Sequence, residues 1–91
     1  MSAFESQITI VNQKGLHARA SIKLSELAQN FNCEISISNE KTKADAKNIL
    51  QLMMLAASKG SKLNLRCHGA DAKNAQAAIT ELIDNKFDED S

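Results

Sequence analysis

The chain has 91 residues, of which 43% are hydrophobic, enough for the core of one small domain spanning residues 1–91. Eleven basic and eleven acidic side chains cancel, which argues against a protein that holds nucleic acid by charge. No apolar run approaches the roughly 20 residues that cross a bilayer. The first ten residues do not resemble a secretion signal, so we expect a cytoplasmic protein without membrane contact.

The first half of the chain predicts three strands and one helix. Hydrophobic residues at every second position favour a strand over residues 7–12. Between residues 17 and 31 apolar residues recur at steps of three or four, which indicates a helix. Its predicted buried stripe consists of Ala20, Leu24, Leu27, Ala28 and Phe31. Residues 33–38 alternate again and predict a second strand, and residues 41–45 predict a short polar strand at a sheet edge.

The second half adds two helices and one strand. We expect a helix from about residue 47 to residue 59, where Gly60 would end it. Residues 62–67 alternate and predict a strand, and Asp71 is placed to cap a last helix. The buried stripe of that helix is predicted to be Ala75, Ala78, Ile79 and Leu82. The order β-α-β-β-α-β-α predicts an α+β domain with an antiparallel sheet covered by helices on one side.

The acidic charge is concentrated at the end of the chain. Four of the eleven acids lie in the last eight residues: Asp84, Asp88, Glu89 and Asp90. The chain through residue 83 carries ten basic and seven acidic groups, so the body is basic by three charges. We expect residues 84–91 to form a solvated, fraying tail, with a role in partner binding as the alternative.

The two cysteines, Cys33 and Cys67, are too few for a disulfide framework. We expect both thiols to be reduced and to pack as small hydrophobic residues. Neither cysteine stands in a spacing typical of a zinc site, so the sequence predicts no metal site.

The chemistry-bearing stretch is residues 14–21, at the junction of the first strand and the first helix. Gly15 permits a sharp entry, and His17 then falls at the start of the helix. The unpaired backbone N–H groups and the positive end of the helix dipole favour an anion there, phosphate above all. Arg19 adds a planar donor suited to phosphoryl oxygens, and the His17 imidazole is a nucleophile for phosphorus. His68 has no such surroundings.

The run Gly15-Leu16-His17-Ala18-Arg19, within this order of elements, resembles the active-site motif of the HPr family, the histidine-containing phosphocarriers of the bacterial phosphotransferase system. The resemblance covers nearly the whole chain. It implies an HPr-like open-faced β-sandwich, with sheet order 1-4-2-3 and three helices on one face. That sheet order would bring Cys33 and Cys67 onto neighbouring strands.

The resemblance also implies how the protein works. His17 would be phosphorylated at Nδ1 by an Enzyme I charged with phosphoenolpyruvate and would pass the phosphoryl group to a IIA protein. Arg19 and the backbone amides of Ala18, Arg19 and Ala20 would hold the phosphoryl oxygens. The implied protein is a monomeric carrier that is itself covalently phosphorylated, has no cofactor and contacts neither nucleic acid nor membrane.

Two positions depart from the family pattern, and two segments indicate a branch. Ala20 replaces a proline that is frequent in the family, which changes the rigidity of the first helical turn. Asn48 stands where many members of the sugar branch carry a regulatory serine, so that control should be absent. Residues 52–55 and 87–90 resemble the nitrogen-related branch of the family, with the sugar-transport branch as the alternative.

Large apolar residues outside the predicted core indicate a docking surface. Ile22 lies off the buried stripe of its helix, and Ile49, Leu50 and Met53 lie on the outer side of the next helix. A contiguous exposed apolar patch beside one reactive histidine is typical of an interface. In the HPr family the matching positions contact Enzyme I and IIA proteins.

Two other classes share this order of elements. A ferredoxin-like, RNA-recognition-type binding module would need aromatic residues on the open sheet face, and the outward strand positions carry none. The other alternative is an interaction domain without chemistry. Phosphoryl uptake separates a carrier from both.

Overall fold

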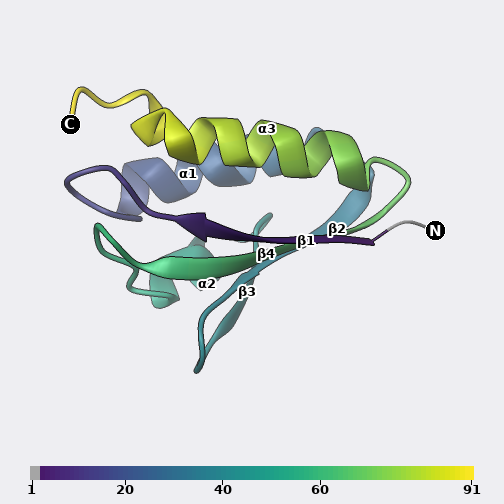
Figure 1. Ribbon diagram of the computed structural model, residues 1–91, viewed down its shortest axis with the longest axis horizontal. Helices are drawn as coiled ribbons and strands as arrows, with labels where there is room; N and C mark the ends of the chain where they lie inside the picture. Colours follow the sequence, from purple (N-terminus) through teal and green to yellow (C-terminus); the bar gives the residue numbers. More distant parts are fainter. Residues whose placement is uncertain (1–2) are drawn as a thin grey trace.

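The computed structural model describes residues 3–91 as one sheet and a set of helices (Figure 1). In chain order the elements are β1 (Ala3–Thr9), α1 (Ala18–Ala28), β2 (Cys33–Ser38), β3 (Lys43–Asp45), α2 (Ile49–Met54), β4 (Lys62–Gly69), α3 (Ala72–Asp84) and a 3₁₀ turn (Lys86–Asp88). Among residues 3–91 the longest helix has 13 residues, and none of the helices there combines the length and the apolar character that a membrane span requires.

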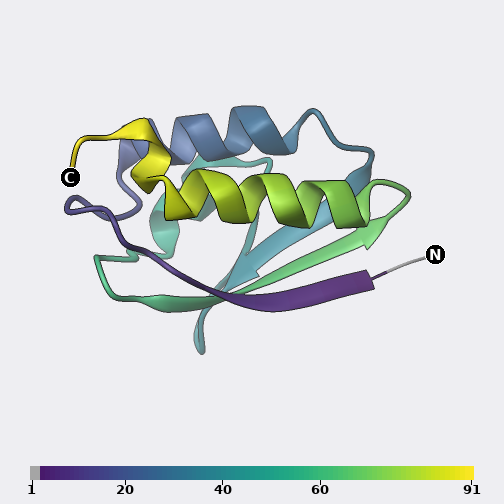
Figure 2. The same cartoon turned by 45° about the horizontal axis from the view of Figure 1, so that its top comes forward.

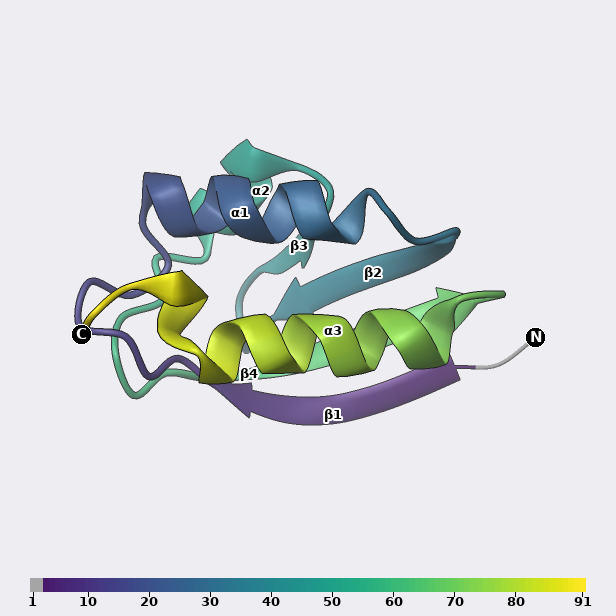
Figure 3. The same cartoon turned by 90° about the horizontal axis from the view of Figure 1, so that it is seen from above.

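The sheet has the order β1-β4-β2-β3, and every neighbouring pair is antiparallel. Helices α1 and α3 lie side by side over one face, as Figures 2 and 3 show, and α2 packs against α1 and β3. The predicted α+β fold and strand order are confirmed. Neither α1 nor α3 lies on the opposite, open face of the sheet (Figure 1).

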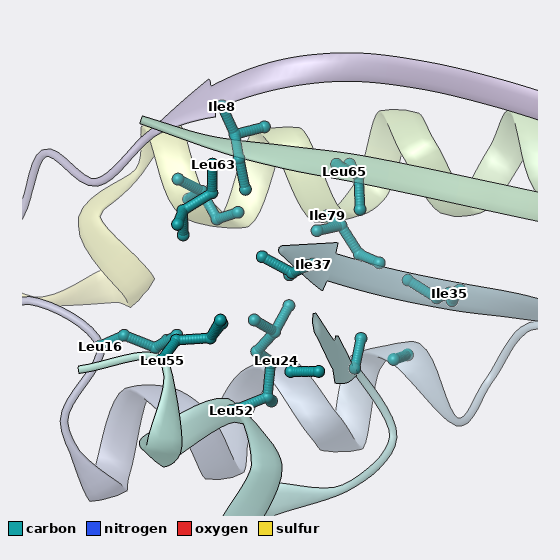
Figure 4. Close-up of a cluster of buried hydrophobic side chains, with 14 of the residues drawn as sticks. Ile8, Leu16, Leu24, Ile35, Ile37, Leu52, Leu55, Leu63, Leu65 and Ile79 are labelled. Atoms are coloured by element: carbon teal, nitrogen blue, oxygen red, sulfur yellow. The ribbon is translucent and has the colours of Figure 1, made fainter. Parts of the chain in front are cut away.

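The core lies between the sheet and the helices (Figure 4). Leu24 of α1 and Leu52 of α2 are fully buried against Ile37 of β2, and Ile79 of α3 is buried near Leu65 of β4. The side chains of Leu16 and Leu55 extend this core toward the loop after β1 (Figure 4). That loop is therefore anchored to the domain interior by its own apolar side chain.

Strand β1 has different bounds from the predicted strand over residues 7–12. It begins at Ala3, opposite His68, and its ladder with β4 ends at Thr9. Pairing with the longest strand of the sheet thus recruits residues whose own alternation is weak. Past the strand, Ile10 remains buried and its N–H donates to the Ser61 carbonyl at 3.0 Å.

Helix α2 ends at Met54, so the predicted helix to residue 59 is wrong at its C-terminal end. Ala56 then adopts a left-handed φ of 51°, and the chain leaves the helix. The carbonyl of Ala57 accepts the Leu16 N–H at 2.8 Å. The residues that local propensity assigns to the helix are instead used to hold the loop before α1.

Asn48 is the N-cap of α2. Its Oδ1 accepts the backbone N–H of Gln51 at 3.1 Å, which pairs one of the free amides at the helix start. The Asn48 side chain therefore has a structural role in starting α2.

Helix α3 begins as expected, but its cap and its stripe differ from the prediction. Asp71 occupies the N-cap position, yet its carboxylate accepts the Asn32 N–H at 2.8 Å and makes no cap bond. The buried residues of the helix are Ala72, Ala75, Ile79 and Ile83, whereas Ala78 and Leu82 are half-buried. The helix is thus rotated so that Ile83 replaces Leu82 against the sheet.

The prediction of a solvated, fraying tail is wrong. Phe87 is fully buried, and its carbonyl accepts a hydrogen bond from Lys23 Nζ at 3.1 Å. Lys86, Phe87 and Asp88 all have positive φ values, between 53° and 63°. Non-glycine residues adopt that conformation at a cost in free energy, which the burial of a phenylalanine offsets here. The tail is folded back onto the domain.

The two cysteines lie on neighbouring strands, as the sheet order implies. Cys67 pairs with Ile35 and Cys33 pairs with Gly69, so the thiols are diagonal neighbours and both are free. Burial, with a smaller effect of nearby Cys33, raises the pKa of Cys67 to about 11. Burial also raises the pKa of Cys33. Both side chains are therefore protonated near neutral pH and poorly nucleophilic.

Candidate functional site

The loop between β1 and α1 is held against the segment after α2. Gly15 has a φ of 69°, and a Cβ added to it would lie 2.5 Å from the Ala57 carbonyl oxygen and 2.9 Å from Ser58 Cα. A side chain does not fit there, and the left-handed conformation favours glycine as well. This close approach, with the Leu16 hydrogen bond to Ala57, fixes where the following histidine lies.

His17 is the N-cap residue of α1, in the position that the sequence predicts. Its backbone is extended (φ −78°, ψ −177°), and its carbonyl accepts the first helical hydrogen bond, from the Ser21 N–H at 2.8 Å. Its side chain makes no capping bond, so the imidazole is free for other contacts. The amides of Ala18, Arg19 and Ala20 form the first turn, where helix geometry leaves them without intrahelical partners. This end of α1 favours an anion.

A surface hollow surrounds the imidazole. Three cationic side chains line it, those of Lys14, Arg19 and Lys23. Three acids of the C-terminal tail line it as well: Asp88, Glu89 and Asp90. The structure therefore brings His17, Arg19 and the opening amides of α1 together, as expected, and adds an acidic wall that sequence reasoning placed in solvent.

The contact that sequence reasoning missed joins His17 to the tail. Glu89 Oε2 lies 2.5 Å from His17 Nε2. The other carboxylate oxygen accepts a hydrogen bond from Asn12 Nδ2 at 3.0 Å, and the same Asn12 amide donates to the Gly15 carbonyl at 2.8 Å. The sequence holds one signal for this contact: the polar residue Asn12 continues the inward alternation of Ile8 and Ile10. In the structure Asn12 is fully buried.

Several groups set the charge state of Glu89. Burial raises the pKa of its carboxyl, but the hydrogen bonds from Asn12 and His17, with the charges of His17 and Lys14, have the larger combined effect and lower the pKa below its ordinary value. Glu89 is consequently ionised near neutral pH. The imidazole therefore faces a carboxylate on one side of its ring.

Helices α1 and α2 carry a set of exposed apolar residues, the apolar patch. The predicted residues are all exposed: Ile22 by 42%, Ile49 by 36%, Leu50 by 72% and Met53 by 41%. Met54, at the end of α2, is 72% exposed and extends the patch, although sequence reasoning did not include it. Leu52 of the same helix is fully buried. The two helices that carry these residues pack against each other.

The open face of the sheet offers no comparable site for RNA. Its paired outward positions include Gln7 opposite Asn64 and Ser36 opposite Arg66. The strands described in residues 3–91 present no aromatic side chain on that face, since Phe4 packs against the core. This observation disfavours an RNA-recognition-type module. Nor is any group of three His, Cys, Asp or Glu side chains in the described chain arranged to hold a metal ion.

Comparison with known proteins gives consistent results. The family described as "PTS HPr component phosphorylation site" matches residues 4–85. The chain is 46% identical to the phosphocarrier protein NPr of Shewanella violacea over the full length of both. It is 47% identical over 81 residues to the phosphocarrier protein HPr of Cupriavidus necator, covering 89% of this chain and 91% of that one.

A solved structure is similar over nearly all residues. The crystal structure of HPr from Thermoanaerobacter tengcongensis superimposes with a TM-score of 0.92 at 34% sequence identity, and covers 97% of this chain and 99% of that one. The sheet order and the placement of the helices are therefore those of a known fold.

Proposed function

Because the chain belongs to the HPr family of phosphotransferase-system phosphocarriers, we propose that it accepts a phosphoryl group on His17 from a phosphoenolpyruvate-charged Enzyme I and passes it to a IIA protein. The observation that carries the proposal is the place of His17 at the N-terminus of α1, beside Arg19 and three open backbone amides. Nucleophile and anion site are thus adjacent.

The transfer needs little beyond this geometry. A ring nitrogen of His17 donates its electron pair to phosphorus, and a new N–P bond forms as the bond from phosphorus to the donor breaks. The amides and the Arg19 guanidinium are placed to receive the charge on the phosphoryl oxygens. Transfer to a IIA protein is the same displacement with His17 as the leaving group.

The test is incubation of the protein with Enzyme I and phosphoenolpyruvate, followed by intact-mass measurement. We expect a gain of one phosphate per chain that is lost in acid, as a phosphohistidine is. The protein without Enzyme I is the control and should show no gain. A protein that takes up no phosphate from several Enzyme I homologues would contradict the proposal and favour a binding module.

We place the protein in the nitrogen-related branch, as an NPr-type carrier. Residues 52–55, at the end of α2, and residues 87–90 of the tail support this assignment, because both segments resemble that branch. We expect the phosphorylated protein to transfer faster to a IIA protein of the nitrogen branch than to one of a sugar transporter. Faster transfer to the sugar-branch acceptor would instead assign it to sugar-transport HPr.

Arg19 is predicted to speed transfer without being needed for uptake. Its guanidinium stabilises charge that develops as the phosphoryl group moves, so Arg19→Ala should still be phosphorylated but should transfer on the order of tenfold to a hundredfold more slowly. The matched control is Arg66→Ala, which removes the second arginine of the chain, on the open face of the sheet. Rapid-quench measurement of the transfer rate checks the prediction, and equal rates for the two variants would contradict it.

The apolar patch is proposed as the docking surface for both partners. Its residues are exposed on α1, which begins directly after His17, and on α2, which packs against α1. Methionine adapts to differently shaped partners. We expect Ile49→Asp and Met53→Asp to keep the fold and the reactive histidine but to weaken the affinity for Enzyme I and for the IIA protein by about tenfold or more.

Titration of labelled protein with each partner, followed by backbone amide shifts, tests the docking surface. The control is Gln7→Asp on the open sheet face, which should bind both partners normally. If the shifts cluster around Gln7 and spare Ile22, Ile49, Leu50 and Met53, the docking surface lies on the other side of the molecule.

A further inference from the structure

The contact between His17 and Glu89 determines which ring nitrogen carries a proton. Glu89 is ionised near neutral pH, and an ionised carboxylate only accepts hydrogen bonds. At 2.5 Å from Glu89 Oε2, the Nε2 atom must therefore be the donor. In the neutral imidazole the proton then resides on Nε2, and Nδ1 keeps its free electron pair.

The carboxylate is held on both of its oxygens. Oε2 accepts from His17, and Oε1 accepts from Asn12 Nδ2, whose amide is fixed by its second bond, to the Gly15 carbonyl. Asn12 is fully buried, so neither bond competes with bulk water at the asparagine end. The buried amide thus orients the glutamate, and the glutamate orients the ring.

The tail that carries Glu89 is anchored on both sides of it. Before Glu89, Phe87 is buried in the core, and Lys23 Nζ binds the Phe87 carbonyl and lies 3.5 Å from the Asp88 carboxylate. After Glu89, the Ser91 carbonyl accepts the Gln13 N–H at 2.9 Å. A solvated tail needs none of these contacts, whereas a tail that presents one carboxylate to one ring needs anchors of this kind.

We propose that Glu89 is a positioning residue for phosphoryl transfer, which keeps the His17 proton on Nε2 and leaves Nδ1 free to attack phosphorus. This inference rests on the proposed function of His17. The Nδ1 electron pair forms the N–P bond, the bond from phosphorus to the donor breaks, and its electron pair returns to the donor. The Nε2 proton stays in place, and the carboxylate stabilises the positive charge of the phosphorylated ring.

The test combines a spectroscopic measurement with a rate. Ring ¹⁵N chemical shifts distinguish a protonated from an unprotonated nitrogen, and in the neutral wild-type ring we expect the proton on Nε2. In Glu89→Gln the side-chain amide can donate as well as accept a hydrogen bond, so His17 Nε2 no longer has to carry the proton. We therefore expect the ring proton to be distributed over Nδ1 and Nε2. The single-turnover rate of phosphoryl uptake should fall by about tenfold to a hundredfold.

Two variants separate positioning from general effects of charge. Asp84→Asn removes one negative charge from the exposed end of α3, outside the residues that line the hollow around His17, and should leave both the ring shifts and the rate unchanged. Glu89→Asp retains the charge on a shorter side chain and should show an intermediate rate. Equal losses of rate in Glu89→Gln and Asp84→Asn would overturn the proposal, because Glu89 would then act only through its charge.

The wild-type spectrum alone can also overturn the proposal, whatever the variants do to the fold. A neutral wild-type ring with its proton on Nδ1 would overturn the role of Glu89. Equal rates of phosphoryl uptake in the wild type and in Glu89→Gln would also overturn the role of Glu89. That result would leave the proposed function of His17 intact. A wild-type protein that takes up no phosphoryl group would overturn the proposed function itself.

Discussion

The His17→Ala variant is expected to fold as the wild type does and to take up no phosphoryl group from Enzyme I. The imidazole is part-exposed and lies outside the core, so its removal should change the free energy of unfolding by less than about 1 kcal/mol. Without it, the hollow keeps its amides and cations but has no nucleophile beside them. Intact-mass measurement after incubation with Enzyme I and phosphoenolpyruvate checks the loss.

The second histidine of the chain provides the matched control. His68 lies on β4, opposite Ala3 and Glu34 in the sheet and away from the start of α1. His68→Ala should therefore be phosphorylated like the wild type. Phosphate uptake by His17→Ala, or its loss in His68→Ala alone, would place the acceptor on another residue.

The Phe87→Ala variant is expected to be the least stable of the variants considered. Phe87 is fully buried, and truncating a buried phenylalanine costs on the order of 3 kcal/mol or more in the free energy of unfolding. The same change removes the anchor before Glu89, so the His17 ring should also lose its carboxylate partner. Chemical denaturation measures the first effect, and the ring ¹⁵N shifts of His17 report the second.

Phe31→Ala is the control for this stability change. Phe31 is only half-buried where it packs against the core, so its truncation should cost less and should leave the ring shifts of His17 unchanged. If Phe87→Ala instead had the stability of the wild type, the tail would behave as the solvated segment that its acidic composition suggests.

The arrangement of the elements was largely predictable because it depends on short-range patterns. Alternation of apolar residues gives β2 its bounds, and the inward faces of β2 and β4 follow from the same periodicity. The start of α1 at His17 follows from Gly15 and the apolar stripe after it. The sheet order came from the family resemblance, since alternation does not identify which strands pair.

The errors share one physical cause, which is that contacts between distant segments overrode local preference. The Leu16 amide takes the Ala57 carbonyl, and the predicted helix stops at Met54 instead of reaching Gly60. The Asp71 carboxylate accepts a distant amide, from Asn32, and leaves the helix uncapped. Ala57 and Asn32 lie far along the chain from Leu16 and Asp71, so a periodicity over a few neighbouring residues does not predict these contacts.

By itself, the sequence identified the candidate histidine, the helix start that places backbone amides beside it, and the apolar residues left outside the core. Only the tertiary structure decided that the Glu89 carboxylate contacts the His17 imidazole. Asn12 and Glu89 meet only because the strand that leads to Asn12 and the helix that leads to Glu89 end at the same edge of the domain. Three left-handed residues are tolerated before Glu89 because Phe87 is buried, and that burial exists only in the assembled fold.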